Sequence, residues 1–393
     1  MRTLELFSGA GGLAKGLELA GFDHAAFVEF NKHASASLKA NFGEEKVFCG
    51  DVRDFDFSSL NNIDVVAGGP PCQPFSLGGK HQANQDERDM FPYAINAIEV
   101  LTPRAFVFEN VKGLLRPSFA DYFEYIILRL TFPEFAASKA MTWQGHLQCL
   151  KKIDFNNYHG IKYRVSYQLL NAADYGVPQT RERVVIVGVR ADIEQPWTFP
   201  KATHSEDALL WAKHITGEYW ERHGVVFSDR EFLTDTLKDR VAKLQTKFGL
   251  FEPAQKSWLT VRDVLADVPD PKSAHTIYDH SFRDGAKIYS GHTGSDYDSP
   301  AKTIKAGGHG VPGGENMIRF RDGSVRYFTV FEAKRMQTFP DGYVIHGAWG
   351  EAMRQIGNAV PVVFAKKMGD ALRLLLQSKQ VTEFHAAESI AFA

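Results

Sequence analysis

The stretch TLELFSGAGGLAKGLELA, residues 3–20, decides the fold of this chain. Its first part, Thr3–Phe7, is typical of a short strand, and its last part, Leu13–Ala20, has a helical pattern. The turn between them fits the form G-x-G-x-x-G/A, which lets a ligand approach the backbone at the N-terminus of a helix. The stretch therefore predicts a strand, a ligand-binding turn and a helix in direct succession.

The same alternation continues through the first half of the chain. Helices are expected at Lys32–Asn41 and Phe91–Leu101. Further strands are expected at Ala25–Glu29, Val47–Cys49, Ile63–Ala67, Ala105–Glu109, Val165–Leu170 and Val184–Val189. Several of these runs are continuously apolar, as in strands that are buried on both faces. The pattern predicts an α/β fold with a doubly wound, mostly parallel sheet.

After about residue 190 this rhythm breaks. Residues 191–325 are irregular, and Gly307 to Gly314 hold five glycines in eight positions. Helical periodicity returns at Thr329–Gln337 and Val360–Gln377. We expect a catalytic α/β domain at 1–190, a smaller irregular domain at 191–325, and a C-terminal segment at 326–393 that returns to the first domain.

Composition limits the classes of function. The formal net charge of the 393 residues is −2, so a nucleic-acid surface must be a local basic face. Only three cysteines occur, which argues against a disulfide framework and favours a reducing compartment such as the cytoplasm. Their spacing fits no zinc site. No signal peptide and no membrane-spanning stretch are expected.

Two carboxylates follow predicted strands near the glycine turn. Glu29 ends the second strand, 20 residues after Gly9, where it can accept hydrogen bonds from ribose hydroxyls. Asp51 follows the third strand and can meet the exocyclic amine of an adenine. On these residues alone, a nicotinamide-binding fold and a turn without a ligand both remain open.

A cysteine follows the fourth predicted strand, in the run GGPPCQPFS at residues 68–76. Pro70 and Pro71 fix the backbone and place the thiol of Cys72 at the carboxyl end of a parallel strand, where open α/β sheets have their active sites. The alternative is a buried structural cysteine. Cys49 and Cys149 lack such surroundings and are expected only to pack.

The run around Cys72 resembles the catalytic motif of the cytosine-5 DNA methyltransferases, especially those of bacterial restriction-modification systems. The other blocks of that family occur in family order: FSGAGG at 7–12, ENV at 109–111, QTRER at 179–183, RMQTFP at 335–340 and QIGNAVP at 355–361. The resemblance covers nearly the whole chain outside 191–325. It implies a Rossmann-like, class I methyltransferase fold that uses S-adenosylmethionine.

The chemistry explains why such residues are needed. A thiolate that adds to carbon 6 of cytosine makes carbon 5 nucleophilic, and Cys72 is the implied nucleophile. Glu109 would offset the charge that develops at N3 by holding or sharing a proton. Arg183 is the better candidate for O2 of the base, with Arg181 nearby, since both side chains should point the same way. The alternatives are a turn residue for Glu109 and a solvated surface pair for the arginines.

The resemblance also implies binding sites for the cofactor and the DNA. The cofactor pocket would include Phe7, Ser8, Gly9, Ala10, Gly11, Gly12, Glu29, Asp51, Val52, Pro71, Asn358, Ala359 and Val360. The target base must leave the duplex, and the segment 76–89 is expected to close over the DNA. The expected DNA contacts are Ser76, Lys80, Arg88, Lys302, Lys305 and His309, with 191–325 as the target-recognition domain.

Duplex DNA is the expected partner, with a cognate restriction endonuclease as a functional rather than physical partner. One branch of the family methylates transfer RNA, but it usually carries a Cys-Phe-Thr block, and no cysteine follows Cys149 here. A non-catalytic relative would be expected to lose Cys72 or the glycine turn. A nicotinamide oxidoreductase gives no account of the Pro-Pro-Cys run.

Overall fold

The computed structural model describes residues 1–71, 89–138, 141–226, 234–306 and 316–390, with side chains to residue 378. A seven-stranded sheet has the order β3-β2-β1-β4-β5-β7-β6. Its strands are β1 Arg2–Leu6, β2 Asp23–Glu29, β3 Val47–Cys49, β4 Val65–Gly68, β5 Ala105–Val111, β6 Tyr163–Asn171 and β7 Glu182–Arg190. The first five strands in this order are parallel, whereas β7 is antiparallel to both β5 and β6. The predicted α/β class with a mostly parallel sheet is confirmed.

Successive residues of the central strands pack alternately into two separate hydrophobic cores, one on each face of the sheet. Val66 of β4 and Phe106 of β5 pack on one face of the sheet, whereas Val65 and Val107 pack on the other. Both faces are covered by helices, so these strands are apolar at nearly every position. This burial explains why a continuous apolar run predicted them.

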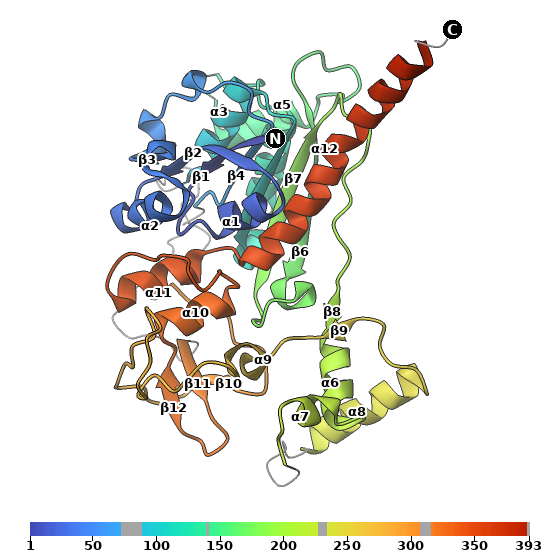
Figure 1. Cartoon of the computed structure of the whole chain (residues 1–393). Helices are drawn as coiled ribbons and strands as arrows, with labels where there is room; N and C mark the ends of the chain where they lie inside the picture. The colour runs from blue at the N-terminus through green and yellow to red at the C-terminus, as the bar shows by residue number, and fades with distance from the viewer. Residues whose placement is uncertain (72–88, 139–140, 227–233, 307–315, 391–393) are drawn as a thin grey trace.

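Helices cover both faces of the sheet (Figure 1). They are α1 Gly12–Leu19, α2 Lys32–Phe42, α3 Phe91–Leu101, α4 Ala120–Thr131 and α5 Trp143–Leu150. The 3₁₀ turns are η1 Glu44–Lys46, η2 Val52–Asp54, η3 Phe57–Ser59, η5 Lys112–Leu115, η6 Pro117–Phe119 and η7 Ala172–Tyr175. The residues of α3 and α4 belong to one core, and those of α1 belong to the other together with the C-terminal helix α12, Val362–Ile390. The first part of α12, up to Leu376, thus packs against the first helix of the chain.

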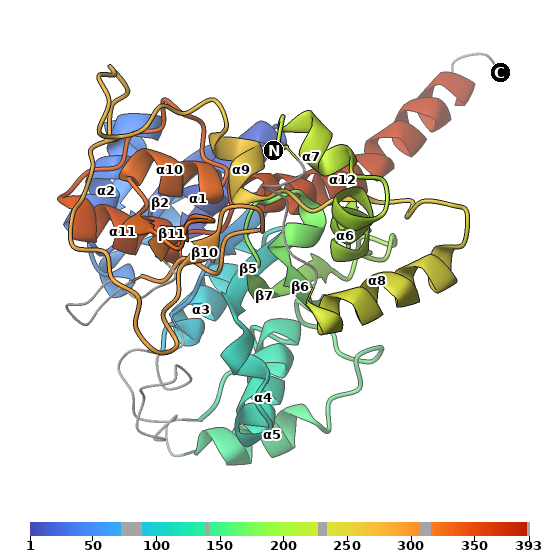
Figure 2. The ribbon, with the colours of Figure 1, turned by 90° about the horizontal axis from the view of Figure 1, so that it is seen from below.

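The lower part of the molecule in Figure 1 holds two groups of short elements, which Figure 2 shows from below. One group comprises β8 His204–Ser205, α6 Glu206–His214, α7 Glu218–Arg222, α8 Asp235–Phe248 and β9 Lys256–Ser257. The other comprises α9 Val261–Leu265, β10 Ser295–Asp296, β11 Met317–Arg319, β12 Val325–Tyr327, α10 Val330–Met336 and α11 Trp349–Asn358.

The sequence predicts that residues 191–325 are irregular, whereas the structure has the helices α6, α7 and α8 there. Residues 208–213 of α6 are all buried, so the helix shows no apolar stripe. In α8 the buried residues are Val241 and Leu244, too few for a clear period. Because α6 is buried on all sides and α8 is mostly exposed, neither helix shows the regular alternation of apolar and polar residues that predicts a helix.

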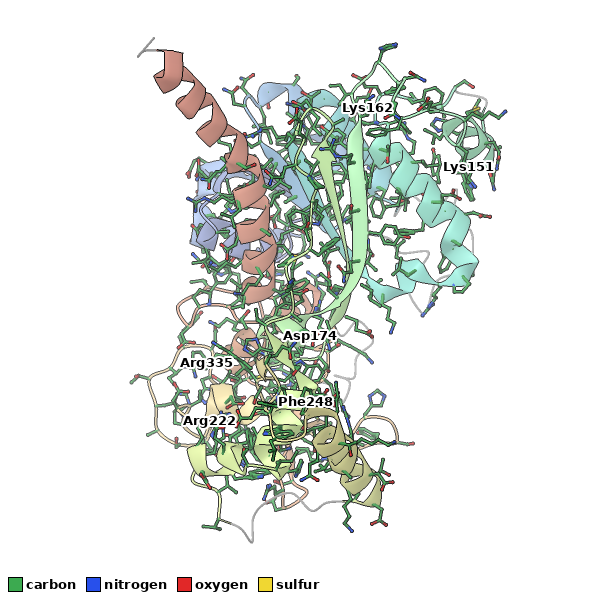
Figure 3. All side chains as sticks on the ribbon, turned by 90° about the vertical axis from the view of Figure 1, so that its right-hand side faces the viewer. Lys151, Lys162, Asp174, Arg222, Phe248 and Arg335 are labelled. Atoms are coloured by element: carbon green, nitrogen blue, oxygen red, sulfur yellow. The ribbon has the colours of Figure 1, made fainter. Side chains whose placement is uncertain are left out.

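Buried hydrogen bonds and ion pairs connect the two groups of short elements to each other and to the sheet. The carboxylate of Asp298 accepts hydrogen bonds from Arg262, Arg321 and Tyr219, at 2.6, 3.1 and 2.9 Å. Trp258 donates its indole N–H to Asp174 at 2.9 Å, and Figure 3 labels Asp174 where the sheet meets the lower part.

In the described part of the chain, no helix is both long enough and apolar enough to cross a membrane.

Candidate active site

A cavity of about 380 Å³ lies at the carboxyl edge of the parallel strands. Its lining residues come from β1 and the turn after it, the starts of α1 and α2, the ends of β2 and β5, and the residues after β4. The start of β7 and the end of α11, each with adjoining residues, complete it. The lining residues are Glu5, Phe7, Ser8, Gly9, Gly12, Leu13, Glu29, Phe30, Ala34, Gly69, Pro70, Pro71, Glu109, Asn110, Val111, Arg181, Arg183, Arg354, Gln355, Asn358, Ala359 and Val360. The topology explains this gathering, because parallel strands bring their carboxyl ends to one edge.

The glycine turn forms one wall of the cavity. Gly9 has a φ of +53°, and a Cβ built there meets no atom within 4 Å, so the turn leaves open space for a ligand. At Gly12 a Cβ would lie 2.2 Å from the carbonyl oxygen of Val360, so glycine is needed for the C-terminal segment to approach. Ala10 and Gly11 belong to the turn but do not line the cavity, whereas Phe7 and Ser8 do.

Glu29 holds the turn in place. Its Oε2 accepts the N–H of Gly9 and its Oε1 accepts the N–H of Asn31, both at 2.7 Å. Burial raises the pKa of this carboxyl, and the hydrogen bonds oppose that shift. A carboxylate so placed offers its remaining lone pairs to hydroxyl groups in the cavity.

Asp51 and Val52 are not brought to the cavity. Both oxygens of Asp51 face Arg53, at 2.9 and 2.7 Å, and this contact lowers the pKa of the carboxyl. Val52 is buried and belongs to the same core as α3 and α4. The structure shows Asp51 in an ion pair with Arg53, and its contact with an adenine stays a prediction.

Glu109 and Arg183 meet because β5 and β7 are antiparallel. The end of β5 therefore lies beside the start of β7, with Val111 opposite Arg183. The Nε of Arg183 lies 2.5 Å from Oε1 of Glu109, and both side chains are nearly buried, at 13% and 12% exposed. This contact is an ion pair whose N–H is not aligned as a hydrogen bond, since Oε1 has no hydrogen-bond partner among the described residues.

Arg181 lines the same cavity but has a different set of contacts. It is 1% exposed, and it donates to the carbonyl oxygens of Ile304 and Gly357, at 3.3 and 2.8 Å. Burial lowers its pKa well below the usual range of arginine. Arg181 thus joins the segment before the glycine cluster to the end of α11, next to Asn358.

The remaining predicted residues lie near the cavity or outside the described residues. Asn358, Ala359 and Val360 line it, and Gln337 holds the carbonyl of Ala359 at 3.2 Å. Lys302 and Lys305 lie in a segment that pairs with residues 178–181, but they do not line the cavity. Cys72, Ser76, Lys80, Arg88 and His309 lie outside the described residues.

Several lining residues were not predicted. Phe30 directly follows Glu29 and is 74% exposed, which places an aromatic ring at the mouth of the cavity. Arg354 lies one helical turn before Asn358 and pairs with Glu351, at 2.6 and 2.9 Å. Phe30 and Arg354 could have been predicted from the sequence, because they lie close to Glu29 and Asn358, which the sequence analysis had already assigned to the cavity. Glu5 carried no such signal, because it looks like an ordinary strand residue.

Comparison with known proteins agrees with this geometry. Residues 1–373 match the family described as C-5 cytosine-specific DNA methylase. The Type II methyltransferase M.PspPI of Psychrobacter sp. (strain TA137) is 30% identical over 95% of this chain and 79% of its own length. M.NgoPII of Neisseria gonorrhoeae is 30% identical over 96% of both chains. The solved structure of the S. pombe Dnmt2 methyltransferase shares the fold, with a TM-score of 0.56 at 18% identity over 96% of this chain and 99% of that one.

The chain therefore belongs to the C-5 cytosine-specific DNA methylases. Its sheet fits the class I methyltransferase fold, and its activity is that of a DNA cytosine-5-methyltransferase. The transfer RNA alternative is not favoured, since the whole-length relatives are Type II methyltransferases.

Proposed function

We propose that this enzyme transfers a methyl group from S-adenosylmethionine to carbon 5 of a flipped-out cytosine in a specific duplex sequence, with Cys72 as nucleophile. The observation that carries the proposal is the single cavity that joins the glycine turn and Glu29 to Glu109 and Arg183. One end of this cavity suits a nucleoside, and the other suits the reacting base.

The residues of the cavity fit the proposed cofactor. A volume of about 380 Å³ falls in the usual range for small-molecule sites. Glu29 suits ribose hydroxyls, and the exposed ring of Phe30 suits stacking on an adenine. Asn358, Ala359 and Val360 line the cavity beside Gly12 and would hold the methionine end. When bound, S-adenosylmethionine supplies an electrophilic methyl group.

The protein residues do the rest of the chemistry. Pro70 and Pro71 line the cavity and lead directly to Cys72, whose thiolate would add to carbon 6 of the base. Glu109 would hold a proton at N3, where negative charge develops. Arg183, in contact with Glu109, would orient that carboxyl and reach O2 of the base. We assign Arg181 to the support of this site rather than to contact with the base.

We further propose that residues 191–325 form the target-recognition domain, within a chain divided as 1–190, 191–325 and 326–393. Lys302 and Lys305 would contact phosphates beside the cavity, with Ser76, Lys80, Arg88 and His309. The Type II relatives support a role in protecting DNA from a cognate restriction endonuclease in a bacterial cytoplasm.

Mechanism-based trapping tests the proposal. After methyl transfer, carbon 5 must lose its proton before sulfur can leave carbon 6, and a fluorine at that position cannot leave as a cation. Duplex DNA with 5-fluorocytosine at the target should therefore form a denaturation-resistant adduct that requires S-adenosylmethionine and maps to Cys72.

The controls are Cys72→Ser, which should form no adduct, and Cys49→Ser and Cys149→Ser, which should still form it. An adduct on either of those two cysteines, or none from an enzyme active on ordinary DNA, would contradict the assignment of Cys72. Labelled methyl transfer should favour duplex DNA over transfer RNA and fall with rising salt.

A further inference from the structure

The glycine turn has a backbone that its own residues do not fix. Three of the five residues from 7 to 11 are left-handed, with φ of +53° at Phe7, +53° at Gly9 and +78° at Gly11. Glycine adopts positive and negative φ about equally readily, so the peptide between Ala10 and Gly11 has no strong preference of its own. The shape of the turn therefore depends on contacts from outside it.

Tyr343 supplies such a contact. It lies between α10 and α11, the helices directly below α1 and α2 in Figure 1. Its hydroxyl donates a hydrogen bond to the carbonyl oxygen of Ala10 at 2.7 Å, and the N–H of Gly11 donates to the carbonyl oxygen of Ser8 at 2.9 Å. The peptide between Ala10 and Gly11 is thus held at both of its polar groups. A Cβ built at Gly11 would lie 2.5 Å from the hydroxyl oxygen of Tyr343, so glycine is needed here for the hydroxyl to approach.

The side chain and the backbone of Tyr343 are themselves fixed. Tyr343 is 4% exposed and packs against Phe339 and Phe42, with ring centroids 4.7 and 6.2 Å away. Its carbonyl oxygen accepts a hydrogen bond from Nζ of Lys334 at 2.7 Å, and this lysine of α10 is buried. The hydroxyl thus reaches the turn from a rigid position, so the contact costs little additional conformational entropy.

Asn41 of α2 holds the residue that follows Tyr343. Its amide nitrogen donates to the carbonyl oxygen of Val344 at 2.8 Å, and its Oδ1 accepts the N–H of Val344 at 3.0 Å. Because Val344 directly follows Tyr343, these two hydrogen bonds help to set how closely the ring approaches the turn.

We propose that Tyr343 is a positioning residue of the methyl donor site, which holds the peptide between Ala10 and Gly11 in the orientation that shapes the cavity wall. Gly9 and Gly12 line the cavity on either side of this peptide. Without the hydroxyl the peptide can rotate, because Gly11 tolerates either sign of φ. The methyl donor then binds only the fraction of molecules that have the wild-type turn, and its apparent affinity falls accordingly. This inference rests on the proposed use of S-adenosylmethionine.

Tyr343→Phe tests the proposal, because it removes the hydroxyl and keeps the ring. We expect Kd and KM for S-adenosylmethionine to rise roughly three- to tenfold. The kcat and the KM for duplex DNA should stay near those of the wild type, because the bound cofactor restores the wild-type turn. Calorimetry measures Kd, and initial rates of labelled methyl transfer measure the kinetic constants. A fall in kcat with an unchanged KM for S-adenosylmethionine would contradict the positioning role.

Tyr163→Phe is the matched control. The hydroxyl of Tyr163 is also buried and donates to a backbone carbonyl, that of Pro103, at the same 2.7 Å. Tyr163 pairs with Arg190, at the end of β7 remote from Arg183 and the cavity. Both variants should lower the thermal midpoint by similar amounts, but Tyr163→Phe should keep the wild-type affinity for S-adenosylmethionine. An equal loss of affinity in this control would mean that affinity follows overall stability, and the proposal would be wrong.

Asn41→Ala tests the route through Tyr343. It should weaken the binding of S-adenosylmethionine less than Tyr343→Phe does, and the double variant should bind no more weakly than Tyr343→Phe alone. Additive losses would contradict a route through the hydroxyl. If the wild type does not bind S-adenosylmethionine at all, the proposed cofactor is wrong; if the wild type and Tyr343→Phe bind it equally well, only the role of Tyr343 is contradicted.

Discussion

Glu29 connects the glycine turn to the start of α2 through both oxygens of one carboxylate. Glu29→Ala removes these two hydrogen bonds as well as the proposed ribose contact. Since a hydrogen bond to a charged group contributes about 1.5–3 kcal/mol, we expect S-adenosylmethionine to bind roughly 10- to 100-fold more weakly. Calorimetry on the purified protein measures this. An unchanged affinity would remove Glu29 from the cofactor site.

Arg183 is the cation that Glu109 contacts in the cavity. In Arg183→Ala, Glu109 loses its orienting partner and the base loses its proposed O2 contact. We expect kcat to fall roughly 10²- to 10³-fold, because both groups are proposed to act where charge develops in the ring. The affinity for S-adenosylmethionine should change little.

The control lies at the other end of the same strand. Arg190 pairs with Asp192 and with the carbonyl of Thr102, far from the cavity. Arg190→Ala should therefore leave kcat near that of the wild type. A loss of cofactor affinity in Arg183→Ala that matches its loss of kcat would mean that this arginine supports the cavity as a whole.

Sequence motifs predicted the cavity residues that lie at strand ends. They missed residues that can be recognised only from burial and hydrogen bonding in the folded structure. Glu29 and Glu109 end predicted strands, so topology alone places them at one edge. Asp51 also follows a strand, and a motif does not reveal that both of its oxygens accept hydrogen bonds from the neighbouring Arg53. Glu5 became visible only when its burial and its unpaired oxygen were known.

At the scale of elements, α1 and α12 pack closely because α1 carries Gly16. A Cβ built at Gly16 would lie 2.3 Å from the Cβ of Ala365 and 2.7 Å from the backbone nitrogen of Lys366. Gly16→Ala should thus destabilise the protein by about 1–3 kcal/mol through overpacking, although alanine favours helices by about 1 kcal/mol. Urea denaturation measures the free energy of unfolding.

Gly350 provides the matched control, because it is an exposed helical glycine in α11 with no atom within 4 Å of a built Cβ. Gly350→Ala should be neutral or stabilising by up to about 1 kcal/mol. If both substitutions had the same effect, the close approach of α1 and α12 would not explain Gly16.

Elements with regular burial were predictable, and those without it were not. The helix expected at Phe91–Leu101 has those bounds in α3, since one of its faces packs on the sheet and the other is exposed. The strands expected at the centre of the sheet deviate by one or two residues at their ends. The helices α6 and α8 lack a regular stripe, so their existence depends on packing that the local sequence does not display.

At the scale of the whole molecule, the contacts between residues 191–325 and the rest of the chain use backbone atoms in many places. Arg181 donates to the carbonyl of Ile304, Gln179 accepts the N–H of Ile304, and the N–H of Ala301 donates to the carbonyl of Pro178. A different sequence can supply the same backbone groups. The proposed target-recognition domain is therefore suited to exchange between relatives.

We expect a chimera that carries residues 191–325 of a relative with another target to fold and to methylate the sequence of the donor. Conversion sequencing of treated plasmid reads the target, and Cys72→Ser in the chimera should abolish activity. A second chimera exchanges only residues 203–258, because the pairing of β8 with β9 brings the two ends of that segment together. Transfer of specificity with this segment assigns recognition to α6–α8; its absence assigns recognition to the residues between α9 and β12. A folded and active 191–325 chimera that keeps the original target would contradict the proposal, because recognition would then depend on residues of the catalytic domain around the cavity.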